Sequence, residues 1–169
     1  MDLQRLQEPS HYARVLRVLD AFIAGWEPAV AAALPPAFQE WLRLRSRRAF
    51  LQQDLRALRV APAPAARMPG LANEAAAWGS IYVLEGSALG GQVISRTLAQ
   101  RGLSPATGAA YFHGWGEATG AMWREVRGLL ASRLDSPAAI AQACEGARTT
   151  FDTLSHLLES HLHERASAA

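Results

Sequence analysis

The stretch YVLEGSALGGQVI, from Tyr82 to Ile94, places Gly86, Gly90 and Gly91 inside an otherwise apolar helical pattern. Glycine in a helix interior is less stable than alanine by roughly 0.5–1 kcal/mol, so these three glycines forgo about 2–3 kcal/mol. Two arrangements account for such a loss. Either another helix packs here backbone against backbone, or a flat ligand lies against the bare side of the helix.

The rest of the chain follows the helical period, and no segment alternates with the period of a strand. Ser10 is expected to cap a helix that Pro28 ends or kinks, because proline removes a backbone hydrogen bond and clashes with the preceding turn. VAPAPAARMPG, residues 60–70, is too rich in proline for a helix and is expected to be a linker. Further helices are expected at 35–44, 46–58, 71–100, 115–134 and 136–164, with a short one opened by Ser104-Pro105.

These patterns predict an all-α chain with about seven helices, and a bend in the helix of residues 71–100 near its glycines. One domain is expected over residues 1–165, followed by a frayed tail at 166–169. The composition, with 50% hydrophobic and 19% charged residues, is that of a globular protein. A net charge of +2 is too small to indicate a nucleic-acid partner.

Cysteine content and the N-terminal sequence indicate the cellular compartment. Cys144 is the only cysteine, which excludes an internal disulfide, and its apolar helical surroundings predict a buried, inert thiol. MDLQRLQEPS lacks the pattern of a signal peptide, and no apolar run reaches the ~18–20 residues of a membrane helix. The sequence therefore predicts a cytoplasmic protein with no membrane partner.

YVLEGSALGGQVI resembles the distal-helix segment of the heme oxygenases, most closely the bacterial, biliverdin-producing forms associated with bacteriophytochromes. Other segments resemble the same family in the same order, so the likeness extends from about Leu3 to Leu162. These segments are SHYARVLRVLDAFIAGWEP (10–28), RRAFLQQDLRAL (47–58), YFHGWGEATGAMWREV (111–126) and IAQACEGARTTFDTL (140–154). The resemblance implies a single-domain, heme-oxygenase-like helical bundle.

The resemblance also implies a reaction: oxidative opening of heme to biliverdin, with release of iron and CO. Heme is then both cofactor and substrate, O2 is the oxidant, and a ferredoxin or a reductase supplies electrons. A bacteriophytochrome is the implied biliverdin acceptor. The opposing hypothesis is a non-catalytic protein that binds heme or another tetrapyrrole and has lost the axial histidine.

Several residue roles come from the same resemblance. Gly86, Ser87 and Gly90 are expected on the O2 and water side of the distal helix. The residues expected to bind heme are Tyr82, Gly86, Gly90, Gly91, Arg124, Arg127, Arg148 and Phe151. Tyr82, Phe151 and the three arginines also have a simpler alternative, because tyrosine and phenylalanine serve as core residues and arginines often form a solvated helix face.

The axial ligand is the part of the family pattern for which no residue matches. The family's proximal histidine precedes the segment at Ser10–Pro28, and no metal-binding residue is therefore assigned. His11 is expected to be exposed, and polar surface roles are expected for His113, His156, His161 and His163. Two explanations stay open. Either the reading frame is truncated, or the chain is a paralogue without histidine ligation.

If the reading frame is truncated, an open groove would expose apolar residues such as Val15, Leu19 and Phe22.

Two charged features of the sequence carry further expectations. The basic run of Arg43, Arg45, Arg47 and Arg48 forms either a solvated face or a patch for an acidic electron donor. Glu85, the carboxylate inside the glycine motif, is expected to cap a helix or lie on the surface.

Overall fold

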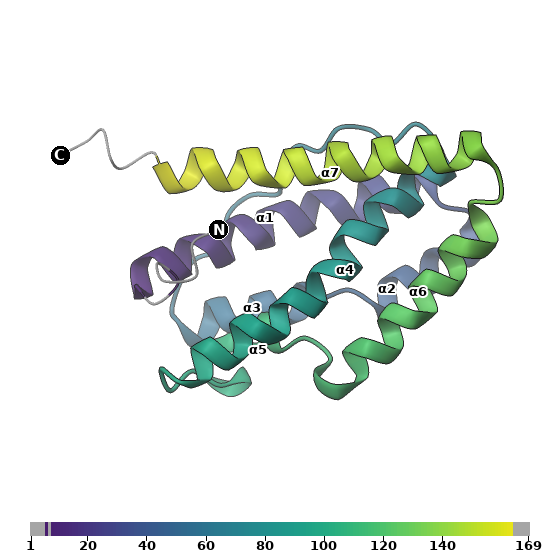
Figure 1. Ribbon diagram of the computed structural model, residues 1–169. Helices are drawn as coiled ribbons and strands as arrows, with labels where there is room; N and C mark the ends of the chain where they lie inside the picture. The colour runs from purple at the N-terminus through teal and green to yellow at the C-terminus, as the bar shows by residue number, and fades with distance from the viewer. Residues whose placement is uncertain (1–5, 7, 164–169) are drawn as a thin grey trace.

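Helices build all of the regular structure in the computed structural model, which describes residue 6 and residues 8–163, without the side chains of 162 and 163 (Figure 1). No strand occurs among these residues, as the sequence predicted. The α-helices are α1 (Pro9–Ala33), α2 (Gln39–Leu44), α3 (Arg48–Ala57), α4 (Glu74–Ala99), α5 (Ala110–His113), α6 (Thr119–Arg133) and α7 (Pro137–His163). Short 3-10 turns at Pro36–Phe38 and Gly116–Ala118 lead into α2 and α6, and a π-helical turn at Pro105–Ala109 precedes α5.

Local sequence signals set some of the helix ends, but the expectation that Ser10 caps the first helix was wrong, because α1 begins at Pro9 after Glu8. The side chain of Asn73 accepts a hydrogen bond from the Ala76 backbone at 3.0 Å and caps α4. Beyond the other end of α4, Gly102 takes a φ of +80°, a left-handed conformation that glycine adopts without strain. Ser104 caps the π-helical turn in a reciprocal arrangement with Thr107. The expected bend in α4 does not interrupt the helix, which is continuous from Glu74 to Ala99.

The prediction that Pro28 ends or kinks the first helix was wrong about the ending. α1 continues through Pro28 to Ala33. Pro28 is exposed, so the backbone carbonyl that loses its partner one turn earlier lies near solvent, which reduces the penalty. Beyond it, Val30 is fully buried and continues the apolar side of the helix. Burial of this apolar side stabilises a further turn of helix beyond Pro28.

Close backbone contact joins α4 and α7. A Cβ added at Gly79 would lie 1.7 Å from the Ala143 carbonyl oxygen, and one added at Gly146 would lie 2.1 Å from that of Ala76. Only glycine permits this approach. Figure 1 shows α7 and α1 running along one side of the molecule, with α4 crossing from α7 toward α3 and α5. The glycines that fix the crossing therefore lie outside the glycine motif.

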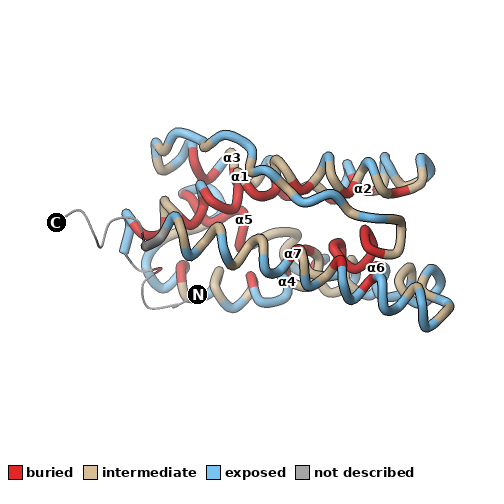
Figure 2. Tube along the Cα trace, turned by 90° about the horizontal axis from the view of Figure 1, so that it is seen from above, coloured by how far each residue is buried: buried red, intermediate tan, exposed pale blue. Residues whose placement is uncertain are grey.

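The core lies where α1 faces α3, α4 and α7, and Figure 2 shows buried residues concentrated along these inner sides. Val15 and Phe22 are fully buried, and Leu19 is 7% exposed. The expectation that these residues would line an open apolar groove was therefore wrong. Neighbouring helices and the segment at 60–70 cover α1, and Ala66 donates a backbone hydrogen bond to Ala21 at 2.8 Å.

Two further burial predictions were wrong. His11 is buried rather than exposed, because the first turn of α1 is already packed against the rest of the bundle. Cys144 is exposed rather than buried. Its neighbour Ala143 faces α4, so the next residue along the helix points about 100° away from that contact.

A buried polar group positions the short segment before α5. The Asp54 carboxylate accepts hydrogen bonds from the backbone nitrogens of Ala110 at 2.7 Å and Tyr111 at 2.8 Å. Tyr12 donates its hydroxyl proton to the Gly108 carbonyl at 2.7 Å, and burial raises the pKa of this phenol, which keeps it a donor. Gly108 has a φ of +121°, which a side chain would strain. α1 and α3 thus hold the chain that passes beneath α4.

Candidate functional site

One side of α4 carries large apolar side chains that remain substantially exposed. Tyr82 is 51% exposed, Leu89 is 40% exposed and Val93 is 53% exposed. Spacings of seven and four residues place these side chains in one stripe, and Gly86 lies within it. On α7, Phe151 is 60% exposed. The sequence thus builds an apolar helix side with a glycine at its centre, here called the α4 face and defined by Tyr82, Gly86, Leu89, Gly90 and Val93.

The three glycines of the motif have different surroundings. A Cβ added at Gly91 would lie 3.0 Å from the Phe112 carbonyl oxygen, so this glycine packs against backbone. A Cβ at Gly90 would meet no atom within 4 Å. A Cβ at Gly86 would lie 3.4 Å from the indole ring of Trp123. Helix packing thus accounts for Gly91, and open space lies at Gly90.

Trp123 and Tyr82 form the aromatic side of the α4 face. Trp123 belongs to α6, and its ring centroid is 5.3 Å from that of Tyr82, with the planes inclined by 56°. The indole also lies against Gly86. A larger residue at position 86 would displace this ring, whereas a side chain at Gly90 would extend into open space.

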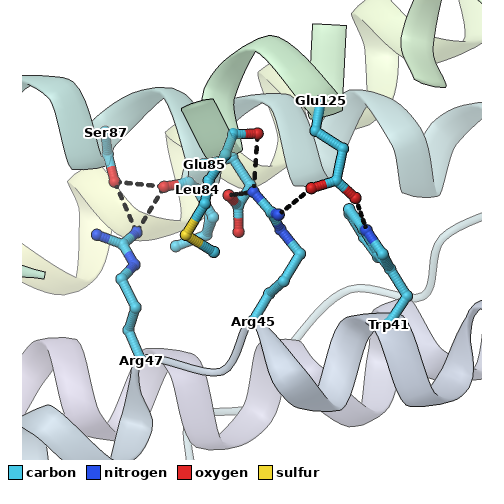
Figure 3. A network of polar contacts seen from close by, with 8 residues as sticks. Trp41, Arg45, Arg47, Leu84, Glu85, Ser87 and Glu125 are labelled. Atoms are coloured by element: carbon cyan, nitrogen blue, oxygen red, sulfur yellow. Dashed lines mark hydrogen bonds and ion pairs between the residues drawn. The ribbon is translucent and has the colours of Figure 1, made fainter. Parts of the chain in front are cut away.

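Arg45 connects three parts of the chain beneath the α4 face (Figure 3). Its guanidinium pairs with Glu85 of α4 at 2.5 Å and with Glu125 of α6 at 3.1 Å, and it donates to the Met122 carbonyl at 3.0 Å. The side chain is only 5% exposed. Trp41 donates its indole N–H to the other oxygen of Glu125 at 2.7 Å.

Arg47 holds the same turn of α4 from a neighbouring position (Figure 3). It donates to the Leu84 carbonyl at 2.5 Å and to the Ser87 hydroxyl at 3.0 Å. The Ser87 hydroxyl in turn donates to the Leu84 carbonyl at 2.6 Å. The guanidinium carbon lies 5.0 Å from the centre of the Tyr111 ring, a cation–π contact. Ser87 is therefore fixed in orientation on the turn that carries Gly86.

The basic run was expected to form a solvated face or a patch for an acidic electron donor. Both expectations were wrong for Arg45 and Arg47, which are 7% and 6% exposed. Arg43 is exposed and pairs with Glu40, as a solvated face predicts. Glu85 was also placed wrongly, since its side chain is 12% exposed and ion-paired. A carboxylate inside an apolar helix is stabilised by a buried cation. Glu85 was therefore the sequence feature that could have predicted a buried arginine such as Arg45.

The other expected heme-binding residues lie outside the buried network. Arg124 and Arg127 of α6 and Arg148 of α7 are exposed, and Arg148 pairs with Glu145 at 2.8 Å. His113, His156 and His161 are exposed, in keeping with surface positions, and the side chain of His163 is outside the described residues. No group of three His, Cys, Asp or Glu side chains suited to a metal ion occurs in the described part of the chain.

A cavity of about 570 Å³ lies elsewhere, between α1, the segment at 60–70 and α7. Its lining includes Arg14, Arg17 and Leu157 but no residue of the α4 face. The exposure of Tyr82, Leu89 and Val93 shows that the α4 face is an open surface. Within the described residues, no helix combines the length and hydropathy needed to span a membrane.

Comparison with known proteins agrees with this architecture. The family model described as heme oxygenase matches residues 38–160. A heme oxygenase of Xanthomonas campestris pv. campestris (strain 8004) is 39% identical over 140 residues, which are 83% of this chain and 84% of that protein. Crystal structures of the NO- and CO-bound heme oxygenase from Neisseria meningitidis share the fold, with a TM-score of 0.79 at 24% identity, over 99% of this chain and 84% of the other. The chain belongs to the heme oxygenase family of enzymes.

Proposed function

We propose that this protein binds heme on the α4 face and opens the ring oxidatively to biliverdin, with release of iron and CO. Heme is the substrate as well as the group that activates O2, so the protein contributes orientation and a polar environment. The observation that carries the proposal is the α4 face, with exposed apolar side chains around Gly90, where no atom lies within 4 Å of an added Cβ. A flat, apolar macrocycle matches such a surface.

The roles proposed for individual residues follow from their positions. Gly90 leaves space for O2 against the helix, and Gly86 and Ser87 present the polar turn beside it. Arg47 keeps the Ser87 hydroxyl fixed, so that this oxygen can hold ordered water near the reacting edge. Tyr82 and Phe151 supply aromatic contact with the ring.

The two propionates of heme require cations or solvent. Arg124, Arg127 and Arg148 are exposed on α6 and α7, where their guanidinium groups are accessible to a carboxylate at the ring edge. Arg148 would exchange its partner Glu145 for a propionate. Gly91 contributes by allowing α4 to approach Phe112 closely, which supports the face from behind.

The reaction needs electrons, and the proposed donor is a ferredoxin or a reductase. Of the basic run, Arg43 and Arg48 retain exposed side chains, which contact with an acidic donor requires. A bacteriophytochrome is the proposed biliverdin acceptor, and the cytoplasm is the proposed location.

Anaerobic heme titration, followed by addition of O2 and a reductant, tests this function. A new heme absorption band on binding, replaced by a biliverdin band after O2, is the expected result. Heme that binds and stays unchanged under these conditions would contradict the enzymatic reaction and support a tetrapyrrole carrier. Because fold alone does not separate these two functions, the chemical product is the deciding observation.

A further inference from the structure

Trp123 stands at the boundary of the α4 face. Its indole lies against Gly86 and beside the Tyr82 ring, whereas Gly90, one turn further along α4, has open space next to it. A flat ring placed on the α4 face would therefore be free to extend past Gly90 and would meet the edge of the indole near Gly86. In that position the indole would block movement of the ring within its own plane.

The position of the indole is fixed by the residues on either side of Trp123 in α6. Arg45 holds the carbonyl of Met122, directly before Trp123, and the carboxylate of Glu125, two residues after it. The same guanidinium binds Glu85, directly before Gly86 in α4. One buried cation therefore sets the distance between the indole and the glycine turn.

Trp41 strengthens this arrangement from α2. Its indole N–H donates to Glu125, and the Arg45 guanidinium carbon lies 4.8 Å from the centre of its ring. Since a helix is rigid over one turn, fixing Met122 and Glu125 fixes the direction in which the intervening side chain leaves α6. The network of Figure 3 thus holds α6 on both sides of Trp123.

We propose that Trp123 is a specificity-determining residue that sets the in-plane seating of the heme ring, with Arg45 and Glu125 as positioning residues, and thereby determines which meso carbon is opened. This inference rests on the proposed function. The opened carbon is the one nearest the O2 directed by the α4 turn. A ring that slides or rotates past the indole brings another meso carbon to that point.

The test is product analysis after a single turnover with heme, reductant and O2, in which the verdin isomers are separated by chromatography. The variants are Trp123→Ala and Glu125→Ala, the latter at a side chain that is 52% exposed. Trp115→Ala, which removes a ring packed on Phe50, and Glu40→Ala, which removes an exposed ion pair, are the matched controls.

We expect Trp123→Ala to change the isomer ratio by about tenfold or more, in the range typical of removed pocket contacts. Glu125→Ala should shift the ratio in the same direction by less, and both controls should keep the wild-type ratio. A Trp123→Ala protein that opens heme to the wild-type isomers overturns the inference and leaves the proposed function standing.

A second measurement separates this outcome from failure of the proposed function. Proton NMR of the heme methyl groups in the cyanide-bound ferric complexes reports ring seating without turnover. If the wild-type protein binds heme and forms no verdin, the proposed reaction fails. A methyl pattern that changes in Trp123→Ala but not in Trp115→Ala then supports the role of Trp123 in seating the ring. Identical patterns in the two variants overturn it, and a wild-type protein that binds no heme overturns both proposals.

Discussion

Gly79 of α4 and Ala143 of α7 are in backbone contact, so that a Cβ on Gly79 would lie 1.7 Å from the Ala143 carbonyl oxygen. No side-chain rotation relieves such an overlap, because both partners are backbone. The two helices would have to separate, and the neighbouring close contact between Gly146 and Ala76 would open with them. This crossing, rather than the glycine motif of the sequence, sets the tightest approach between helices.

Gly79→Ala is therefore expected to lower the free energy of unfolding by about 1–3 kcal/mol or more, the typical effect of overpacking a core. Urea denaturation followed by circular dichroism measures this change. Gly90→Ala is the matched control on the same helix, where no atom lies within 4 Å. It should gain roughly 0.5–1 kcal/mol from helix propensity. Equal stability of the two variants would contradict the packing described here.

Gly86→Leu is expected to reduce heme turnover at least about tenfold while helix content is retained. The reason is local, because a leucine side chain must displace the Trp123 ring from its place beside the α4 turn. Gly86→Ala, whose Cβ would lie 3.4 Å from the ring, should behave nearly as wild type. Verdin formation and far-UV circular dichroism are the measurements. A Gly86→Leu protein that unfolds without heme would show that position 86 serves packing instead.

Arg45→Met is expected to lower the free energy of unfolding by about 3–5 kcal/mol, because it leaves the Glu85 carboxylate buried without its cation. Arg43→Met is the control, since it removes an arginine whose ion pair with Glu40 is exposed. That change should stay within about 0.5 kcal/mol. Thermal or urea unfolding of both variants tests the difference. Similar losses would indicate that Arg45 contributes no more than a surface charge.

Asp54 gives a prediction of pH dependence. Burial raises the pKa of this carboxyl above its ordinary value of 3.8, and the hydrogen bonds from Tyr111 and Ala110 oppose the rise without cancelling it. The folded state then binds the proton more readily than the unfolded state. For this group, stability rises as the pH falls through the folded pKa toward 3.8.

Asp54→Asn removes this titration and turns an amide NH2 toward one of two backbone N–H donors, which should cost about 1–3 kcal/mol near neutral pH. The stability gap between wild type and variant should widen as the pH is lowered. Urea titrations at a series of pH values measure it, with the exposed Asp152→Asn as control. A gap that narrows at low pH would contradict the raised pKa of Asp54.

The sequence by itself determined the all-α fold and most helix boundaries. Helical periodicity, the proline-rich segment at 60–70, Gly102 and the Ser104 cap act over a few neighbouring residues, so their effects can be read locally. It also singled out α4 as the helix proposed to carry the site, since three glycines in a helix need a partner that comes from outside it.

Only the tertiary structure decided what each of these residues faces. It assigned Gly91 to packing against Phe112, left space at Gly90 and placed Trp123 against Gly86. It also turned Arg45 and Arg47 inward, although an arginine run is usually solvated. The physical reason is the same in each case. Burial and ion pairing depend on which distant segment covers a side chain, and the partners of Arg45 lie 40 and 80 residues away along the chain.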